Sequence, residues 1–227
     1  MKVAIIDQEK SNWLIKSLKK YGFEINNKNP DVVITNGGDG TILLSERLYP
    51  GVPKLTLKTS KICRKCDYTP KYFDILLQKV TKKQYKIVSV QKVEAKIKNK
   101  KLVALNEIQV RHKNPTVAIR FSVSIDGKNF DNIIGDGVIV ASPFGSTGYY
   151  KSAGGKPFSS GIGLVFNNMY TDGEKYFILP KTARVTVKIN REDALLIRDN
   201  DNKFYTLKPK EQVVIQMSKE KAKFLQF

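Results

Sequence analysis

The sequence is poor in the residues that most often build metal and redox sites. Its 227 residues include one histidine, His112, and two cysteines, Cys63 and Cys66. A structural zinc site normally takes four histidine or cysteine ligands, so this single Cys-x-x-Cys pair is two cysteines short of one. A metal site bridged between copies and a redox pair are alternatives. We favour two ordinary thiols in a loop and predict no metal site built by the protein alone.

Long apolar runs are also missing. No stretch approaches the roughly 20 apolar residues that a helix needs to cross a bilayer. The first residues, Met1 to Asp7, are typical of a strand rather than of a signal peptide. We therefore expect a cytoplasmic protein with no membrane partner.

Acidic residues are scarce relative to basic ones. There are 40 Lys and Arg against 21 Asp and Glu, which gives a net charge of +19. Such an excess attracts polyanions, including nucleic acids and nucleotides. The lysines are scattered, however, and no basic helix, RNA-binding aromatic motif or zinc-finger spacing accompanies them. We attribute most of the charge to a solvated surface and do not expect a nucleic acid partner.

The composition is otherwise that of a globular protein, with 41% hydrophobic and 27% charged residues. Residues 1–85 alternate apolar strand and helix patterns, which predicts an α/β domain with a parallel sheet. The predicted strands and helices begin at or cover these segments: Lys2 to Ile6, Ser11 onward, Val32 to Ile34, Thr41 onward, Pro53 to Leu57, and Thr69-Pro70 onward.

After about residue 85 the apolar residues recur with a period of two. Val117, Ile119, Phe121 and Val123 alternate with polar residues, and similar runs follow. This pattern predicts a β-rich second domain over residues 86–210. The apolar segment 211–227 is expected to pack back on the first domain. No Pro-, Gly- or Ser-rich linker separates the two predicted domains.

One glycine-rich stretch stands between a predicted strand and a predicted helix. Gly37, Gly38 and Gly40 surround Asp39, and Thr41 opens the helical pattern. Glycines at a helix start let the backbone approach a phosphate closely. The free N–H groups there then stabilise the negative charge of the phosphate. Asp39 would then take a proton from an attacking hydroxyl or hold a metal on the phosphates. In the alternative interpretation Asp39 only caps the helix.

Two further segments interrupt the β pattern. Asn106 and Glu107 lie side by side in an apolar strand, and can meet one ligand only at a strand end or bulge. In the alternative interpretation one of the two side chains simply faces solvent. Residues 135–155 combine two glycine-rich turns with many hydroxyl groups and Tyr149. Glycines admit a ligand, hydroxyls bind sugar and phosphate, and an aromatic ring stacks on a base. We interpret the segment as a binding loop.

These three motifs, in this order and spacing, resemble the NAD kinase family. The resemblance covers most of the chain and is strongest from residue 31 to 155. It implies an α/β N-terminal domain plus a β-rich C-terminal domain, with the active site between them. It also implies transfer of the terminal phosphoryl group of ATP, or of polyphosphate, to the 2′-hydroxyl of the adenosine ribose of NAD. The family uses Mg²⁺ or another divalent metal and forms homodimers or homotetramers.

The resemblance also assigns roles by motif. Asp39 matches the general base, and Gly37, Gly38, Gly40 and Thr41 match the phosphate-binding turn. The positions matching the NAD site are Asn106, Glu107, Asp136, Thr147, Tyr149 and Ser152. Phe144 departs from the family pattern, which has a small hydroxyl residue there.

Two other classes of protein remain as alternatives. Lipid kinases of the diacylglycerol and sphingosine type share the Gly-Gly-Asp-Gly-Thr motif, and a non-catalytic NAD(P)-binding protein would share the binding loop. The segment 135–155 favours NAD kinase over the first, and Asp39 favours it over the second.

Overall fold

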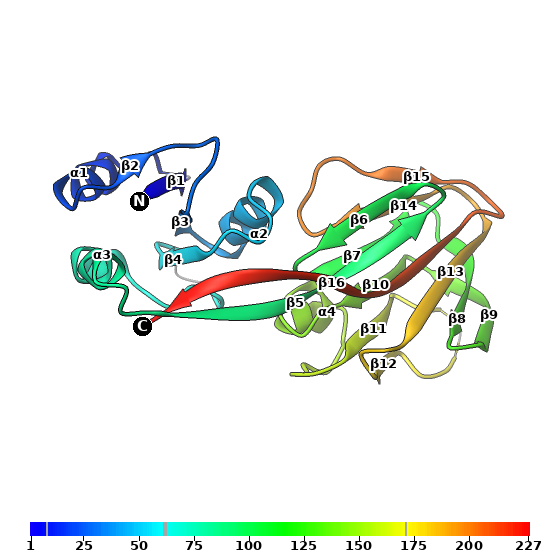
Figure 1. Cartoon of the computed structure of the whole chain (residues 1–227). Coiled ribbons are helices and arrows are strands. Elements are labelled where there is room, and N and C mark those ends of the chain that lie inside the picture. The colour runs from blue at the N-terminus through cyan, green and yellow to red at the C-terminus, as the bar shows by residue number, and fades with distance from the viewer. Residues whose placement is uncertain (8, 61–62, 171) are drawn as a thin grey trace. The chain divides into compact units, whose positions relative to one another are not determined.

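The computed structural model describes residues 1–7, 9–60, 63–170 and 172–227. The chain divides into two compact units (Figure 1). Unit 1 consists of residues 1–90 together with residues 221–227, and unit 2 consists of residues 91–220. The chain therefore leaves unit 1 once and returns to it after unit 2.

Unit 1 is an α/β structure. Its elements are β1 (Lys2–Asp7), α1 (Asn12–Lys20), β2 (Glu24–Ile25), β3 (Val32–Gly37), α2 (Asp39–Leu48), β4 (Lys54–Lys58), the 3₁₀ helix η1 (Pro70–Tyr72), α3 (Phe73–Thr81) and the start of β5 (Lys86–Ile97). Parallel pairing gives the strand order β2-β1-β3-β4, and Phe224 of β16 (Gln212–Gln226) pairs with Lys54 of β4. The predicted parallel sheet is confirmed.

The core of unit 1 shows why its sequence is patterned as it is. All six residues of β3 are buried, as expected for a central parallel strand with both faces covered. Leu14 and Leu18 of α1 pack with Phe73 and Leu77 of α3 in one cluster with the sheet. Helices α1 and α3 lie together on one face, and α2 lies on the other (Figure 1).

Unit 2 is almost entirely β-structure. Its elements are the rest of β5, β6 (Lys100–Ala104), β7 (Glu107–His112), β8 (Ile119–Ile125), β9 (Lys128–Gly135), β10 (Gly137–Ala141), the 3₁₀ helix η2 (Gly145–Thr147), α4 (Tyr149–Ser152), β11 (Ile162–Asn167), β12 (Tyr176–Leu179), β13 (Arg184–Arg191), β14 (Ala194–Arg198), β15 (Tyr205–Leu207) and most of β16. One sheet has the order β12-β11-β10-β7-β14-β15, and β16, β13, β8 and β9 lie side by side in another. The pairs β7–β10, β8–β13 and β13–β16 are antiparallel.

The inner faces of the two sheets supply the core of unit 2. In β8 the buried residues alternate with half-buried ones, which confirms the period of two seen in the sequence. Strand β10 is buried along its whole length. Val138 and Val140 face the main core, whereas Ile139 and Ala141 pack in a second cluster with Tyr150 of α4. Strand β10 is therefore covered on both faces, and the binding loop is anchored to one of them.

No helix in the described ranges is long and apolar enough to cross a membrane.

Candidate functional site

The glycine-rich stretch of unit 1 connects strand β3 directly to helix α2. We call residues 37–41 the phosphate turn. Gly37 has φ +154°, and a Cβ there would collide with the Thr41 side chain. Gly38 is the N-cap of α2, and a Cβ on it would lie 3.2 Å from Ser60 Cβ. The turn is therefore as tight as glycine allows.

Helix α2 begins two residues earlier than the sequence pattern indicates. The predicted helix starts at Thr41, whereas α2 starts at Asp39. The Thr41 N–H donates to Gly38 O at 3.0 Å, which closes the first turn around Asp39 and Gly40. Both residues have helical geometry at the positive end of the helix dipole, where an anion is favoured.

The Asp39 carboxylate is held by the loop that contains the two cysteines. The backbone N–H groups of Arg64 and Lys65 each donate to Asp39 Oδ1 at 3.1 Å. No side-chain hydrogen bond caps α2 in the described part of the chain. Asp39 is therefore fixed by a neighbouring loop rather than serving as the cap of its own helix, which rules out the alternative interpretation of this residue.

Cys63 and Cys66 form a disulfide, so the prediction of two ordinary thiols is wrong. Their Cα atoms are 5.8 Å apart, within the usual range for a bridge. Cys63 Sγ lies 3.1 Å from Asp39 Oδ1, and Cys66 Sγ lies 3.7 Å from Gly37 O. A redox pair was one of the alternatives that the sequence left open, but nothing in the sequence indicated that the two cysteines lie against the phosphate turn.

Thr41 presents an unsatisfied polar group beside the turn. Its hydroxyl is buried and has no hydrogen-bond partner among the described residues. A buried hydroxyl without a partner costs free energy, so such groups are rare unless they bind something. The Thr41 hydroxyl is thus available to a ligand at the turn.

Asn106 and Glu107 lie at the start of β7 in unit 2. Asn106 precedes the strand and Glu107 is its first residue, so the pair sits at a strand end, as expected for neighbours that share one ligand. In the described structure Asn106 Oδ1 and Glu107 Oε2 are both buried without a hydrogen-bond partner. Burial, and next the charge of Asp199, raise the pKa of Glu107 to about 8. Glu107 therefore carries a proton at neutral pH and is a hydrogen-bond donor.

The binding loop reaches the same place. A Cβ on Gly145 would lie 2.6 Å from Asn106 Cα. A Cβ on Gly148 would lie 3.4 Å from Asn106 Nδ2 and 3.9 Å from Glu107 Oε2. Glycines at 145 and 148 thus let the loop lie against Asn106 and Glu107. Thr147 and Tyr149 flank Gly148 in the chain, so they come close to Asn106 and Glu107. Ser152 follows on α4.

Asp136 lies elsewhere. It precedes β10, whereas Ser142 and the binding loop follow that strand. Since five strand residues span about 17 Å, Asp136 is far from Asn106 and Glu107 within one copy. Its carboxylate accepts a hydrogen bond from Asn168 Nδ2 at 2.7 Å, and His112 Nδ1 lies 3.3 Å away.

Comparisons with known proteins agree with this arrangement of motifs. The sequence model of the family described as ATP-NAD kinase C-terminal domain matches residues 105–227. The NAD kinase of Sulfurisphaera tokodaii is 31% identical over 227 residues, which covers 96% of this chain and 90% of that protein. The NAD kinase of Thermoplasma volcanium is 32% identical over 93% of this chain and 79% of its own length. The chain belongs to the NAD kinase family of enzymes.

Solved structures of the family agree in fold. An NAD kinase from Archaeoglobus fulgidus, crystallised in complex with ATP, superimposes with a TM-score of 0.86 at 26% identity, over 99% of this chain and 93% of that one. A yeast NADH kinase complexed with NADH superimposes with a TM-score of 0.89 at 18% identity, over 100% of this chain and 83% of that one. The predicted NAD kinase-like two-domain fold is confirmed.

Membership of the NAD kinase family does not by itself explain Tyr150, which sequence reasoning missed. Its ring is fully buried and packs edge-on against Phe158. A Cβ on Gly155 would overlap this ring, and one on Gly163 would lie 2.8 Å from it. Burial, with Tyr176 nearby, raises the pKa of Tyr150 to about 12. Tyr150 therefore anchors the binding loop, and the two glycines that make room for it were the available sequence clue.

Proposed function

We propose that this chain transfers the terminal phosphoryl group of ATP to the 2′-hydroxyl of the adenosine ribose of NAD, which gives NADP and ADP. The observation that carries the proposal is the pair of unpartnered buried atoms, Asn106 Oδ1 and Glu107 Oε2, beside the glycines of the binding loop. An acceptor on Asn106 and a donor on protonated Glu107 suit a neutral ligand group that both donates and accepts, such as a ribose hydroxyl or the edge of adenine.

The phosphate turn supplies the other half of the reaction. The helix start binds the phosphate chain of the donor, and the Thr41 hydroxyl, which has no partner among the described residues, adds a hydrogen bond. Asp39 accepts the proton of the 2′-hydroxyl as its oxygen bonds to the terminal phosphorus and the bond from that phosphorus to the ADP oxygen breaks. Such a transfer needs alignment and charge neutralisation more than covalent help. Polyphosphate presents the same phosphate chain, so it is the second donor to test.

Magnesium fits this site only as part of the donor. In the described ranges, the one cluster of three metal-ligand side chains is Asp39 with Cys63 and Cys66. Mg²⁺ prefers oxygen ligands and usually binds through one or two carboxylates together with substrate phosphates. We therefore propose that it arrives on ATP, with at most Asp39 as a protein ligand. When bound it would neutralise phosphate charge.

We also propose a homodimer or homotetramer. The edge strand β12 exposes Ile178, at 45%, and Tyr170 is 84% exposed in the same unit. Exposed apolar residues at a sheet edge favour pairing with another chain. Light scattering coupled to size-exclusion chromatography measures the assembly directly.

The test is a coupled assay for NADP formation from NAD, Mg²⁺ and either ATP or polyphosphate. Asp39→Asn keeps the shape of the side chain and removes its capacity as a base. We expect kcat to fall by about two to four orders of magnitude, the usual contribution of a general base. Asp67→Asn is the matched control, because Asp67 is an exposed carboxylate in the same loop, and it should keep wild-type kcat.

The possible results separate the parts of the proposal. Equal turnover by wild type and Asp39→Asn would remove the base role and leave the reaction in place. No NADP from either donor, with folded protein saturated with NAD, would refute the proposed reaction.

A further inference from the structure

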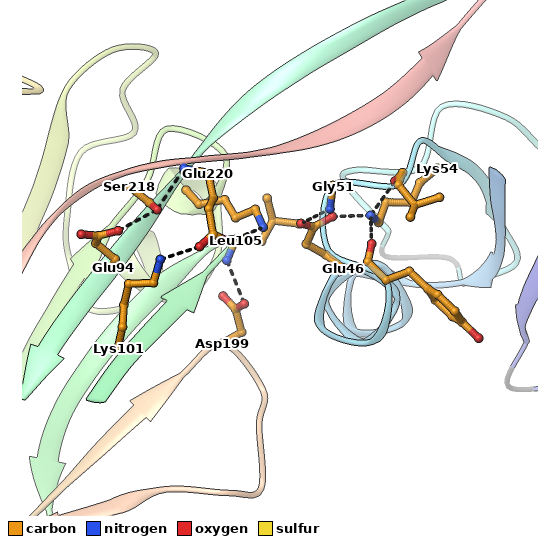
Figure 2. Close-up of polar contacts among 12 residues, drawn as sticks. Glu46, Gly51, Lys54, Glu94, Lys101, Leu105, Asp199, Ser218 and Glu220 are labelled. Carbon is orange, nitrogen blue, oxygen red and sulfur yellow. Dashed lines mark hydrogen bonds and ion pairs between the residues drawn. The ribbon is translucent and has the colours of Figure 1, made fainter. Parts of the chain in front are cut away.

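Asp199 is a buried carboxylate that the proposed reaction does not use. It lies in the turn that follows β14 and is 9% exposed. Its Oδ2 accepts a hydrogen bond from the Leu105 N–H at 2.9 Å (Figure 2). Its Oδ1 accepts from the N–H groups of Asn106, at 2.7 Å, and Glu107, at 3.2 Å. Three successive backbone amides thus converge on one side chain.

The same backbone is fixed from other directions. The Asp199 N–H donates to Glu107 O at 2.9 Å. The Ser142 N–H donates to Asn106 O at 2.8 Å, and the Ser142 hydroxyl donates to Leu105 O at 2.6 Å. The backbone of residues 105–107 therefore has little freedom, although Leu105 and Asn106 lie just before β7 and only Glu107 is paired in its ladder, with Ala141.

The chemistry of Asp199 is well matched to this task. Burial raises its pKa to about 6, while the three N–H donors lower it, so the group is ionised at neutral pH. An ionised carboxylate offers two acceptor oxygens and no donor, whereas an amide of the same shape offers one acceptor and turns a donor toward the N–H groups. Hydrogen bonds to a charged acceptor are also stronger than neutral ones. A buried charge is costly, so its presence at this backbone calls for a reason.

We propose that Asp199 is a positioning residue for NAD, which holds the backbone of residues 105–107 so that Asn106 Oδ1 and Glu107 Oε2 stay aligned toward the ligand. The proposal rests on the proposed NAD-binding role of Asn106 and Glu107. It predicts that loss of the Asp199 carboxylate weakens the binding of NAD more than the binding of the phosphoryl donor.

The decisive comparison is Asp199→Asn with Asp201→Asn. Asp201 is also buried, in the same turn, where it accepts hydrogen bonds from Arg198 Nε and the Lys203 N–H. Both of these hydrogen bonds come from residues in or next to the turn, so Asp201→Asn measures the loss of a buried carboxylate from this turn. We expect Asp199→Asn to raise the Kd for NAD, by calorimetry, about tenfold or more. Its KM for ATP, and its kcat at saturating NAD, should stay within about threefold of wild type, and Asp201→Asn should bind NAD normally.

Unchanged NAD affinity in Asp199→Asn would overturn the inference, and so would equal weakening in Asp201→Asn. If Asp199→Asn does not fold, Ser142→Ala is the second variant, because it releases Leu105 O from the other side. It should weaken NAD binding several-fold, and an unchanged Kd would count against the proposal. Asn106→Ala separates the two hypotheses: if it binds NAD normally, the proposed binding site has failed rather than the role of Asp199.

Discussion

At the scale of single residues, the unit 2 site contains polar atoms that are buried and have no hydrogen-bond partner among the residues that the structure describes. Burying Asn106 Oδ1 and Glu107 Oε2 without hydrogen bonds lowers the stability of the fold. No hydrogen bond within the described structure compensates for this loss. A ligand that supplies the missing hydrogen bonds recovers that cost on binding. Binding sites often carry such a local penalty, which the rest of the fold must offset.

The raised pKa of Glu107 makes a prediction about pH. Its carboxyl titrates near pH 8 in the folded protein and near 4.5 in the unfolded chain. Between these values the folded state binds the extra proton, so the free energy of unfolding should fall as pH rises from about 4.5 to 8 and then level off. Glu107→Gln cannot titrate and should lose this slope, which amounts to a few kcal/mol.

Urea unfolding at pH 5, 7 and 9 measures the effect. Glu24→Gln is the control, because Glu24 is exposed on the short strand β2, and its pH dependence should match that of wild type. If Glu107→Gln keeps the full pH dependence of the wild-type unfolding free energy, Glu107 is ionised at neutral pH in the wild-type protein.

At the scale of elements, the sequence predicted the regular parts of the fold and missed contacts that form only in three dimensions. The β-branched run Val32 to Ile34 identified β3 because a buried parallel strand is apolar throughout. The alternation from Ile119 to Ile125 identified β8 because a strand with one buried face is apolar at every second residue. Strand β2, with only two residues, has too little pattern to be seen in this way.

The missed features depend on long-range contacts. Asp199 and Leu105 are 94 residues apart, and no local pattern reveals that three amides meet one carboxylate. The contact of the 63–66 loop with Asp39 spans 24 to 26 residues. For the site, local chemistry pointed to Asp39, Asn106 and Glu107. It did not reveal what holds them, or that Asp136 lies at the other end of β10.

The disulfide of the 63–66 loop leads to a prediction at this scale. The bridge closes the turn whose Arg64 and Lys65 N–H groups hold Asp39. Reduction by a dithiol converts the bridge to two thiols while the dithiol becomes a cyclic disulfide. We expect a several-fold lower kcat with an unchanged Kd for NAD, since Asn106 and Glu107 belong to unit 2.

Kinetics before and after reduction, with thiol titration to confirm the state of the pair, measure this effect. The double variant Cys63→Ser, Cys66→Ser should not respond to the dithiol. The expectation fails if reduced wild-type protein keeps its full kcat.

At the scale of the whole molecule, unit 1 depends on a segment that follows unit 2 in the chain. Leu225 is 2% exposed and belongs to the core cluster of unit 1. The Phe227 ring packs edge-on against Tyr68, and the Phe227 N–H donates to the Tyr68 hydroxyl at 3.1 Å. Residues 221–227 are therefore a structural part of unit 1 and not a loose extension of unit 2.

Two neighbouring positions test this dependence. Leu225→Ala should lower the free energy of unfolding by about 2–5 kcal/mol, as for other buried leucines. Gln226→Ala, at an exposed position, should change it by less than about 0.5 kcal/mol. Hydrogen exchange should locate the loss of protection in Leu225→Ala to β1, β3 and β4. Faster exchange spread evenly over unit 2 would contradict the assignment of this segment.

The path of the chain also has a consequence for synthesis. A ribosome makes residues 1–90 first, but the strand segment that completes their sheet is made only after all 130 residues of unit 2, from 91 to 220. Domains generally fold as units, with the N-terminal one first during translation. Here the order should be reversed: unit 2 has its whole sequence before unit 1 does. A nascent chain stopped before residue 221 would carry Asp39 on a sheet without its last strand, and would be the form most in need of a chaperone.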